Sequence, residues 1–128
     1  MASVGGAIRT TLLSAGITGV STRIFRDIAP PETTYPFMTI SDEVSNQPAL
    51  IGDQFVLART RQVRVNLFQI RTSENVEIID EVVTALDRAS INANQIVFRV
   101  RVADIVRLFD SEDDIVQHSV TLNVIHKA

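Results

Sequence analysis

Two long segments near the end of the chain alternate between apolar and polar residues, and this pattern constrains the fold more than any other. In the first, Gln95–Asp110, apolar residues alternate with Arg99 and Arg101. In the second, Asp114–His126, apolar residues and His118 occupy every second position. A period of two is typical of a β-strand with one buried face. The short acidic sequence DSEDD between the segments therefore predicts the turn of a β-hairpin.

The earlier part of the chain predicts three more strands. Thr22–Ile28 is a short segment that ends at two adjacent prolines. Tyr35–Val44 places Met38 and Ile40 on one face, and Phe55–Ile70 alternates in the same way over a longer stretch. Strands that follow one another directly in the chain favour an antiparallel sheet.

Two helices are also predicted, one at each side of these three strands in the chain. The first runs from a cap at Ser3 to Gly16, with apolar residues at helical spacing. The second begins at a cap provided by Thr72 or Ser73 and has acidic residues around one apolar stripe. The stripe consists of Val76, Ile79, Val82, Val83 and Leu86.

The order of the elements, α-β-β-β-α-β-β, predicts a single domain over residues 1–128 in the α+β class. We expect a mostly antiparallel sheet with two helices, one of them packed on a sheet face. Val82 and Leu86 of the second helix should make that contact. Their expected partners on the sheet are Val65, Val100 and Leu122.

Residues 45–58, between the second and third predicted strands, are expected to form a flexible loop. Pro48 and Gly52 interrupt the strand pattern there. Leu50 and Ile51 nevertheless lie in the middle of the segment. Apolar residues on an exposed loop favour a contact with another molecule, so the loop is a candidate interface.

The composition argues against several classes of function. The chain of 128 residues has a net charge of −3 and no cysteine. An acidic protein lacks the basic field that attracts nucleic acid, and a protein without cysteine has neither disulfides nor a thiol nucleophile. No apolar run approaches the roughly 20 residues of a membrane span, and the first residues do not resemble a secretory signal. We expect no cofactor, no metal and no membrane contact.

A search for catalytic groups finds none. His118 and His126 share one strand face but lie about 27 Å apart at strand spacing, too far to bind one ion. We interpret His118 as a core or interface residue. The DSEDD turn lacks the spaced ligands and the glycine of a calcium loop. No nucleophile elbow and no phosphate-binding loop occurs, so the sequence predicts a protein that is not an enzyme.

Arginine dominates the basic residues, since Lys127 is the only lysine among the 12. Arginine suits protein interfaces because its planar fork grips carboxylates, although codon usage in a GC-rich genome would produce the same bias. Arg99, Arg101 and Arg107 have the spacing of a basic stripe on one strand face. The predicted interface residues, for contacts with other copies of the chain or with a partner protein, are Leu50, Ile51, Arg59, Arg61, Arg64, Glu77, Asp80 and Glu81.

The proline-rich part of the chain carries a resemblance to a known family. A short strand with the sequence RIF is followed by APPETTYPFMTI, which holds three of the four prolines and the only tyrosine. This arrangement is similar to the tail completion or tail terminator proteins of long-tailed bacteriophages, in which a strand ends in alanine-proline and restarts at an aromatic residue before proline. The matching positions are Arg23, Ile24, Phe25, Ala29, Pro30, Tyr35, Pro36 and Phe37.

The resemblance implies a structural virion protein. Such proteins assemble as a homo-oligomeric ring, usually hexameric, that caps a finished tail tube and forms the junction to the head. The implied partners are further copies of the chain, the tail tube protein and the head–tail connector or stopper protein. DNA passes through the lumen without specific binding. The implied location is the head-proximal end of the virion tail, after assembly in the host cytoplasm.

Two alternatives stay open. A head-closure or neck protein would differ from a tail terminator in its partners and not in its chemistry. A small ligand-binding regulatory domain is compatible with the same α+β pattern, and it would bind a small molecule instead of assembling into a particle.

Overall fold

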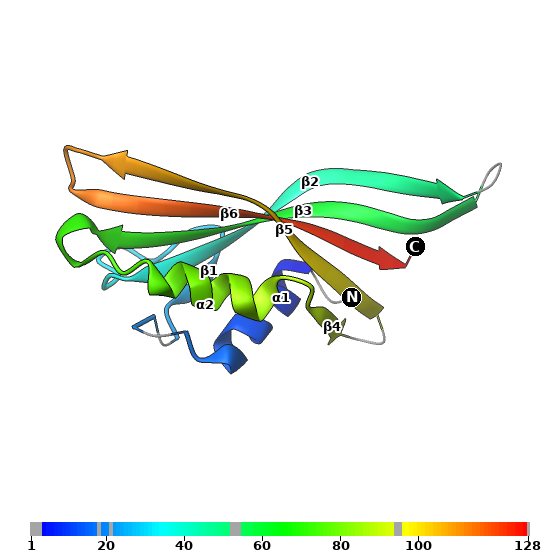
Figure 1. Cartoon of the computed structure of the whole chain (residues 1–128), viewed down its shortest axis with the longest axis horizontal. Helices are drawn as coiled ribbons and strands as arrows, with labels where there is room; N and C mark the ends of the chain where they lie inside the picture. Colours follow the sequence, from blue (N-terminus) through cyan, green and yellow to red (C-terminus); the bar gives the residue numbers. More distant parts are fainter. Residues whose placement is uncertain (1–3, 18, 21, 52–54, 94–95, 128) are drawn as a thin grey trace.

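The computed structural model describes residues 4–17, 19–20, 22–51, 55–93 and 96–127. Its elements are α1 (Val4–Ala15), β1 (Ile24–Arg26), β2 (Phe37–Ile51), β3 (Phe55–Ile70), the 3-10 helix η1 (Arg71–Ser73), α2 (Glu77–Leu86), β4 (Ser90–Ala93), β5 (Ile96–Asp110) and β6 (Ile115–Lys127). The strands form one sheet in the order β1-β2-β3-β6-β5-β4 (Figure 1). Among the described strands, only β1 and β2 pair in parallel. The predicted α+β class with a mostly antiparallel sheet is therefore confirmed.

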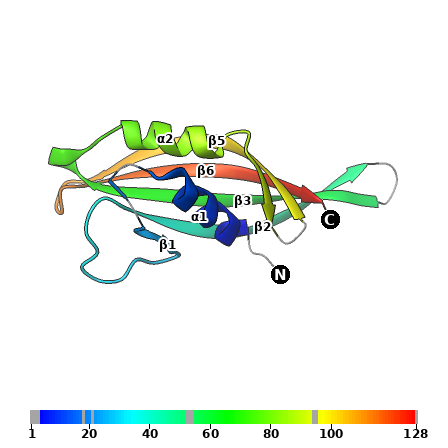
Figure 2. The same cartoon turned by 90° about the horizontal axis from the view of Figure 1, so that it is seen from below.

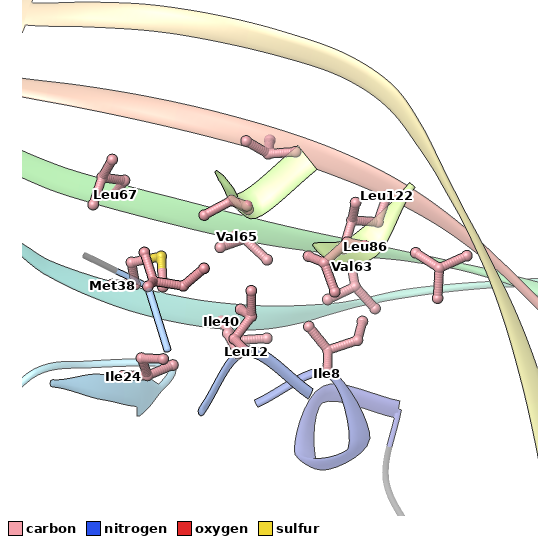
Figure 3. Packing of buried hydrophobic residues seen from close by; sticks show 14 of the residues in the cluster. Ile8, Leu12, Ile24, Met38, Ile40, Val63, Val65, Leu67, Leu86 and Leu122 are labelled. Atoms are coloured by element: carbon pink, nitrogen blue, oxygen red, sulfur yellow. The ribbon is translucent and has the colours of Figure 1, made fainter. Parts of the chain in front are cut away.

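Both helices lie on the same face of the sheet, whereas the sequence predicted this position for one of them (Figures 1 and 2). Helix α1 buries Ile8 and Leu12, and α2 buries Val82 and Leu86, each at helical spacing. Figure 3 shows side chains of both helices pointing toward the strands. The opposite face of the sheet, which we name the outer face, is not covered by either helix.

The core lies between the helices and one set of alternating strand residues. Their side chains belong to a single buried cluster, which includes Met38, Ile40, Val63, Val65, Leu67, Phe98, Val100, Val120, Leu122 and Val124. Val82 and Leu86 are buried in the same cluster as Val65, Val100 and Leu122, as predicted. The period-two pattern therefore identified the buried face of β3, β6 and the first half of β5.

The start of the second helix differs from the prediction. Helix α2 begins at Glu77 and not after Thr72 or Ser73, which belong to η1. Asn75 stabilises this start, since its Oδ1 accepts a hydrogen bond of 3.0 Å from the backbone N–H of Glu77. The later start leaves Val76 outside the buried stripe, with 63% of its surface exposed. The predicted membership of Val76 in the stripe is therefore wrong.

The segment 45–58 is also different from the expected loop. It forms the paired ends of β2 and β3, with Asn46 opposite Arg61 and Ile51 opposite Phe55. A proline is tolerated in this part of β2 because β1 pairs with β2 only at residues 38–40, so Pro48 lies on a sheet edge. The described residues of the segment therefore belong to two paired strands and not to a loop. The flexibility of the segment stays a prediction.

A bulge in β5 was not predicted. The pairing with β6 shifts between Val102 and Asp104, so one extra residue turns the later part of β5 over. Arg107 consequently lies opposite His118 on the helix side of the sheet. Arg99 and Arg101 precede the bulge and point to the outer face. The predicted stripe of these three arginines on one face is therefore wrong.

Candidate functional site

Four aromatic rings gather on the outer face where β1, β2 and β3 meet. Phe37 stacks on Phe68 across the β2–β3 pair, with 4.9 Å between ring centroids. Tyr35 lies 5.1 Å from Phe37, and Phe25 of β1 lies 6.4 Å from it, edge to face. All four side chains are partly exposed. We name these residues the aromatic cluster.

The aromatic cluster contains residues of the motif that resembles tail terminator proteins. Phe25 and Phe37 come from its two ends, 12 positions apart in sequence. Arg23 joins the same ends, because its Nε donates a hydrogen bond of 3.1 Å to the carbonyl of Pro36. The side chain of Ile24 points to the other side of the sheet and is fully buried. The motif therefore holds β1 parallel to the start of β2, and its aromatic side chains form part of the outer face.

Two adjoining grooves share Tyr35, Phe37 and Phe68 as lining residues. The first has a volume of about 340 Å³ and is closed on one side by the proline segment 27–33. The second has a volume of about 330 Å³ and continues to the far end of β5 and the start of β6. Its further lining residues are Leu108, Phe109, Asp110, Ile115 and Gln117. We name the pair the outer-face groove.

Acidic residues lie at the rim of this apolar groove. Asp27 and Glu32 line its first part and Asp110 its second, and all three are exposed. Leu108 has 51% of its surface exposed, which is unusual for a large apolar residue beside three aromatic rings. An apolar floor with an acidic rim is the arrangement expected of a surface that binds an apolar segment with basic residues beside it.

A row of buried polar residues lies on the outer face beside the aromatic cluster. Asn66 donates a hydrogen bond of 3.5 Å to Thr39 Oγ1, and Gln117 donates one of 3.1 Å to Asn66 Oδ1. These bonds link β2, β3 and β6 across the sheet. Because a register shift would leave buried polar groups without partners, the row specifies how the three strands align beneath the groove.

The opposite end of the molecule carries a two-stranded projection. The pairing of β3 with β6 ends at Ala58 and Lys127, whereas β2 and β3 continue together to Ile51 and Phe55. Residues 50–51 and 55–57 therefore extend past β6 as a ribbon, with Ala49 and Ala58 at its base, visible at one end of the long axis (Figure 1). We name these residues the β2–β3 arm. The β5–β6 hairpin lies at the other end of that axis (Figure 1), and its residues line the end of the groove.

The predicted interface residues fall into two groups. Leu50 and Ile51 lie in the arm, and Arg59 follows it in β3, but their side chains lie outside the described part of the structure. Arg61 is half-buried on the helix side, and its buried Nε has no hydrogen-bond partner among the described residues. These four residues are thus close to one another along the hairpin.

The remaining predicted residues lie on opposite sides of the subunit. Arg64 is exposed on the outer face, opposite Ser41 of β2 and Thr121 of β6. The acidic residues of α2 lie on the helix side, where they line a groove of about 460 Å³ beside the end of α1. These residues are Glu77, Asp80 and Glu81. Arg64 can therefore meet them only in another copy of the chain.

The clearest ion-pair cluster was missed in the sequence. Arg107 grips Glu74 through two hydrogen bonds, of 3.0 Å from Nε and 2.8 Å from Nη2. His118 Nε2 lies 3.3 Å from the same carboxylate, and its side chain is almost fully buried. These contacts tie β5 and β6 to the segment before α2. The bulge brings Arg107 to this position, and no residue type in the sequence indicates that bulge.

The environment changes the protonation of the cluster. The hydrogen bonds from Arg107 lower the pKa of Glu74, and burial lowers the pKa of His118 despite the nearby carboxylate. Since His118 Nδ1 is buried without a partner among the described residues, the neutral ring is the form that fits. The interpretation of His118 as a core histidine agrees with its burial.

We expect the free energy of unfolding to decrease as the pH falls below about 6.5, the ordinary pKa of histidine. Below that value the unfolded chain binds a proton at His118 that the folded chain resists, so protonation favours unfolding. Urea denaturation at pH 7.5 and 5.5 measures the loss. His118→Gln should show a smaller loss than the wild type over this range. An equal loss in both proteins would contradict the assignment to His118.

Within the described residues, no group of three or more His, Asp or Glu side chains is placed to hold a metal ion. Neither described helix is long and apolar enough to cross a membrane.

The comparisons with known proteins identify the fold. No family model matches the chain, and no curated protein matches it by sequence. A solved chain from "Virion of native gene transfer agent (GTA) particle" superposes with a TM-score of 0.68 and 12% sequence identity, over 98% of this chain and 96% of that one.

A second solved structure, whose name states no activity, superposes with a TM-score of 0.56 and 13% identity, over 94% of this chain and 89% of its own. Both likenesses extend over nearly the whole length of the chains compared. The protein therefore has the fold of a chain that forms part of a gene transfer agent virion.

Proposed function

We propose that the protein is a structural component of a phage-like virion. The observation that carries this proposal is the likeness to a chain of a gene transfer agent particle, which spans 98% of this protein. The arrangement of Arg23, Phe25 and Phe37 adds support, because residues of the tail terminator motif meet in space and shape one surface. The role is one of assembly and not of catalysis.

In its finer form, the proposal is that the protein caps a finished tail tube as a ring of six copies and joins it to the head connector. The shape of the subunit supports this role. The outer-face groove lies toward one end of the long sheet and the β2–β3 arm at the other (Figure 1). Unlike surfaces at opposite ends favour head-to-tail contacts, which generate rings when the rotation closes.

The edges of the sheet supply a second reason. Among the described residues, β4 pairs with β5 only as far as Arg99, so the part of β5 from Ala103 to Asp110 forms an open edge. β2 is likewise an open edge beyond Ile40. Open strand edges are templates for pairing with another chain, and a protein that remains alone normally blocks them. Copies of the chain, the tail tube protein and the connector are the proposed partners, with DNA passing through the lumen.

Deleting the gene from a particle-producing genome tests the role. A tail terminator is expected to leave filled heads and unjoined tails of uncontrolled length in electron micrographs. Immunogold labelling of complete particles should place the protein at the head–tail junction. Unjoined tails of normal length, with label on isolated heads, would instead indicate a head-closure protein. Normal, joined particles from the deletion strain would contradict a structural role.

A further inference from the structure

The β2–β3 arm consists of apolar residues, which are stabilised when another surface shields them from water. Its residues are Ala49, Leu50, Ile51, Phe55, Val56, Leu57 and Ala58. Leu50 pairs with Val56 and Ile51 with Phe55, and every one of these seven residues is apolar. A two-stranded ribbon is marginally stable by itself in water, and this one extends beyond β6. Another surface should therefore stabilise it.

The outer-face groove is also an apolar surface that its own subunit leaves only partly covered. Its aromatic cluster is only partly covered, and Leu108 is exposed at its far end. The arm cannot fill the groove of its own subunit, because the two lie toward opposite ends of the sheet (Figure 1). A second copy of the chain can do so by a head-to-tail contact.

The charged residues beside the arm and beside the groove favour the same contact. The segment 55–61 of β3 contains Arg59 and Arg61 and no acidic residue. The groove has Asp27, Glu32 and Asp110 at its rim. An apolar ribbon followed by basic residues thus matches an apolar floor edged by carboxylates, which favours this contact over one between two identical surfaces.

We propose that the β2–β3 arm of each copy lies in the outer-face groove of the next copy. This inference rests on the ring assembly proposed above and names the surfaces that form it. Each copy gives one arm and receives one, so the contact repeats around the ring and leaves no arm uncovered. The aromatic cluster, which includes residues of the motif that resembles tail terminators, is part of the receiving surface.

The absence of cysteine from the sequence allows a direct test by cross-linking. In the variant Leu50→Cys with Leu108→Cys, a short bis-maleimide should join neighbouring copies into a ladder of covalent oligomers that ends at the size of the ring. The matched control is Leu50→Cys with Val76→Cys, since Val76 is exposed on the helix side and belongs to neither proposed contact surface. Each single-cysteine variant should give dimers at most.

A second test uses two exposed apolar residues. Leu108→Glu places a charge in the groove, whereas Val76→Glu places one on the helix side, where 63% of the residue is exposed. Neither change enters the core, so both variants should fold. Leu108→Glu should weaken association in sedimentation experiments by at least about tenfold, and Val76→Glu should associate like the wild type.

The outcomes separate this inference from the proposed function. If the wild type forms rings but the Leu50–Leu108 pair cross-links no better than the Leu50–Val76 pair, the arm–groove contact is wrong and the ring stands. Assembly of Leu108→Glu at the wild-type level would also contradict the arm–groove contact. If the wild type forms no oligomer either alone or on purified tails, the ring and the arm–groove contact are both wrong.

Discussion

Replacing Leu86 by alanine is expected to lower the free energy of unfolding by about 2–5 kcal/mol. Leu86 is fully buried at the end of α2, in one cluster with Leu12 of α1 and with Val63 and Leu122 of the sheet (Figure 3). Truncation removes apolar contacts and leaves a cavity between two helices and two strands. That cavity cannot close without moving a helix, so most of the cost should remain.

Urea denaturation of the monomer measures the effect, at a protein concentration low enough to exclude a contribution from assembly. The matched control is Val76→Ala, which truncates an exposed residue directly before the first residue of the same helix. We expect this control to change the free energy of unfolding by less than about 0.5 kcal/mol. A loss below about 1 kcal/mol for Leu86→Ala would show that α2 does not pack on the sheet as described.

The sequence predicted the core well because strand alternation and helix periodicity are local patterns. Val65, Val100 and Leu122 could be assigned to a buried face without knowing which strands are neighbours. The prediction failed where a single local change alters the pattern. The bulge between Val102 and Asp104 contains neither glycine nor proline, so no residue type indicates it. The alternation that places Arg99 on the outer face was therefore continued to Arg107, which is wrong.

Turn residues misled the prediction for segment 45–58. Pro48 and Gly52 are typical of loops, but the position of a strand in the sheet decides whether proline is tolerated. That position depends on where the pairing of β1 with β2 ends, which is a property of the tertiary fold. β4 was missed for another reason, because Ser90–Ala93 is too short to show alternation.

The candidate site was predictable only in part. The motif around Tyr35 and Pro36 identified the segment that borders the outer-face groove. The contribution of Phe68 depends on the register that places it opposite Phe37, and Leu108 arrives from a distant strand. Register is set by pairing along the whole hairpin, so no local pattern in the sequence reveals which aromatic residues meet.

Arg64 offers the second test with a large expected effect, on assembly and not on folding. Its side chain is exposed on the outer face, and the acidic residues of α2 lie on the opposite side of the subunit. If these surfaces meet between copies, the guanidinium grips a carboxylate through two hydrogen bonds that lysine cannot reproduce. Arg64→Lys should therefore weaken ring or tail association, and Arg64→Glu should abolish it.

The melting temperature of the monomer should stay nearly unchanged in both variants, because exposed charges contribute little to folding. Sedimentation of the assembled species, recorded beside a melting curve, separates the two effects. Arg88→Glu is the control, since Arg88 is an exposed arginine on the helix side, just after α2. If charge alone disturbs assembly, Arg88→Glu will reduce it as much as Arg64→Glu does. Equal assembly by the wild type and Arg64→Glu would place Arg64 outside the interface and leave codon usage as the explanation of the arginine bias.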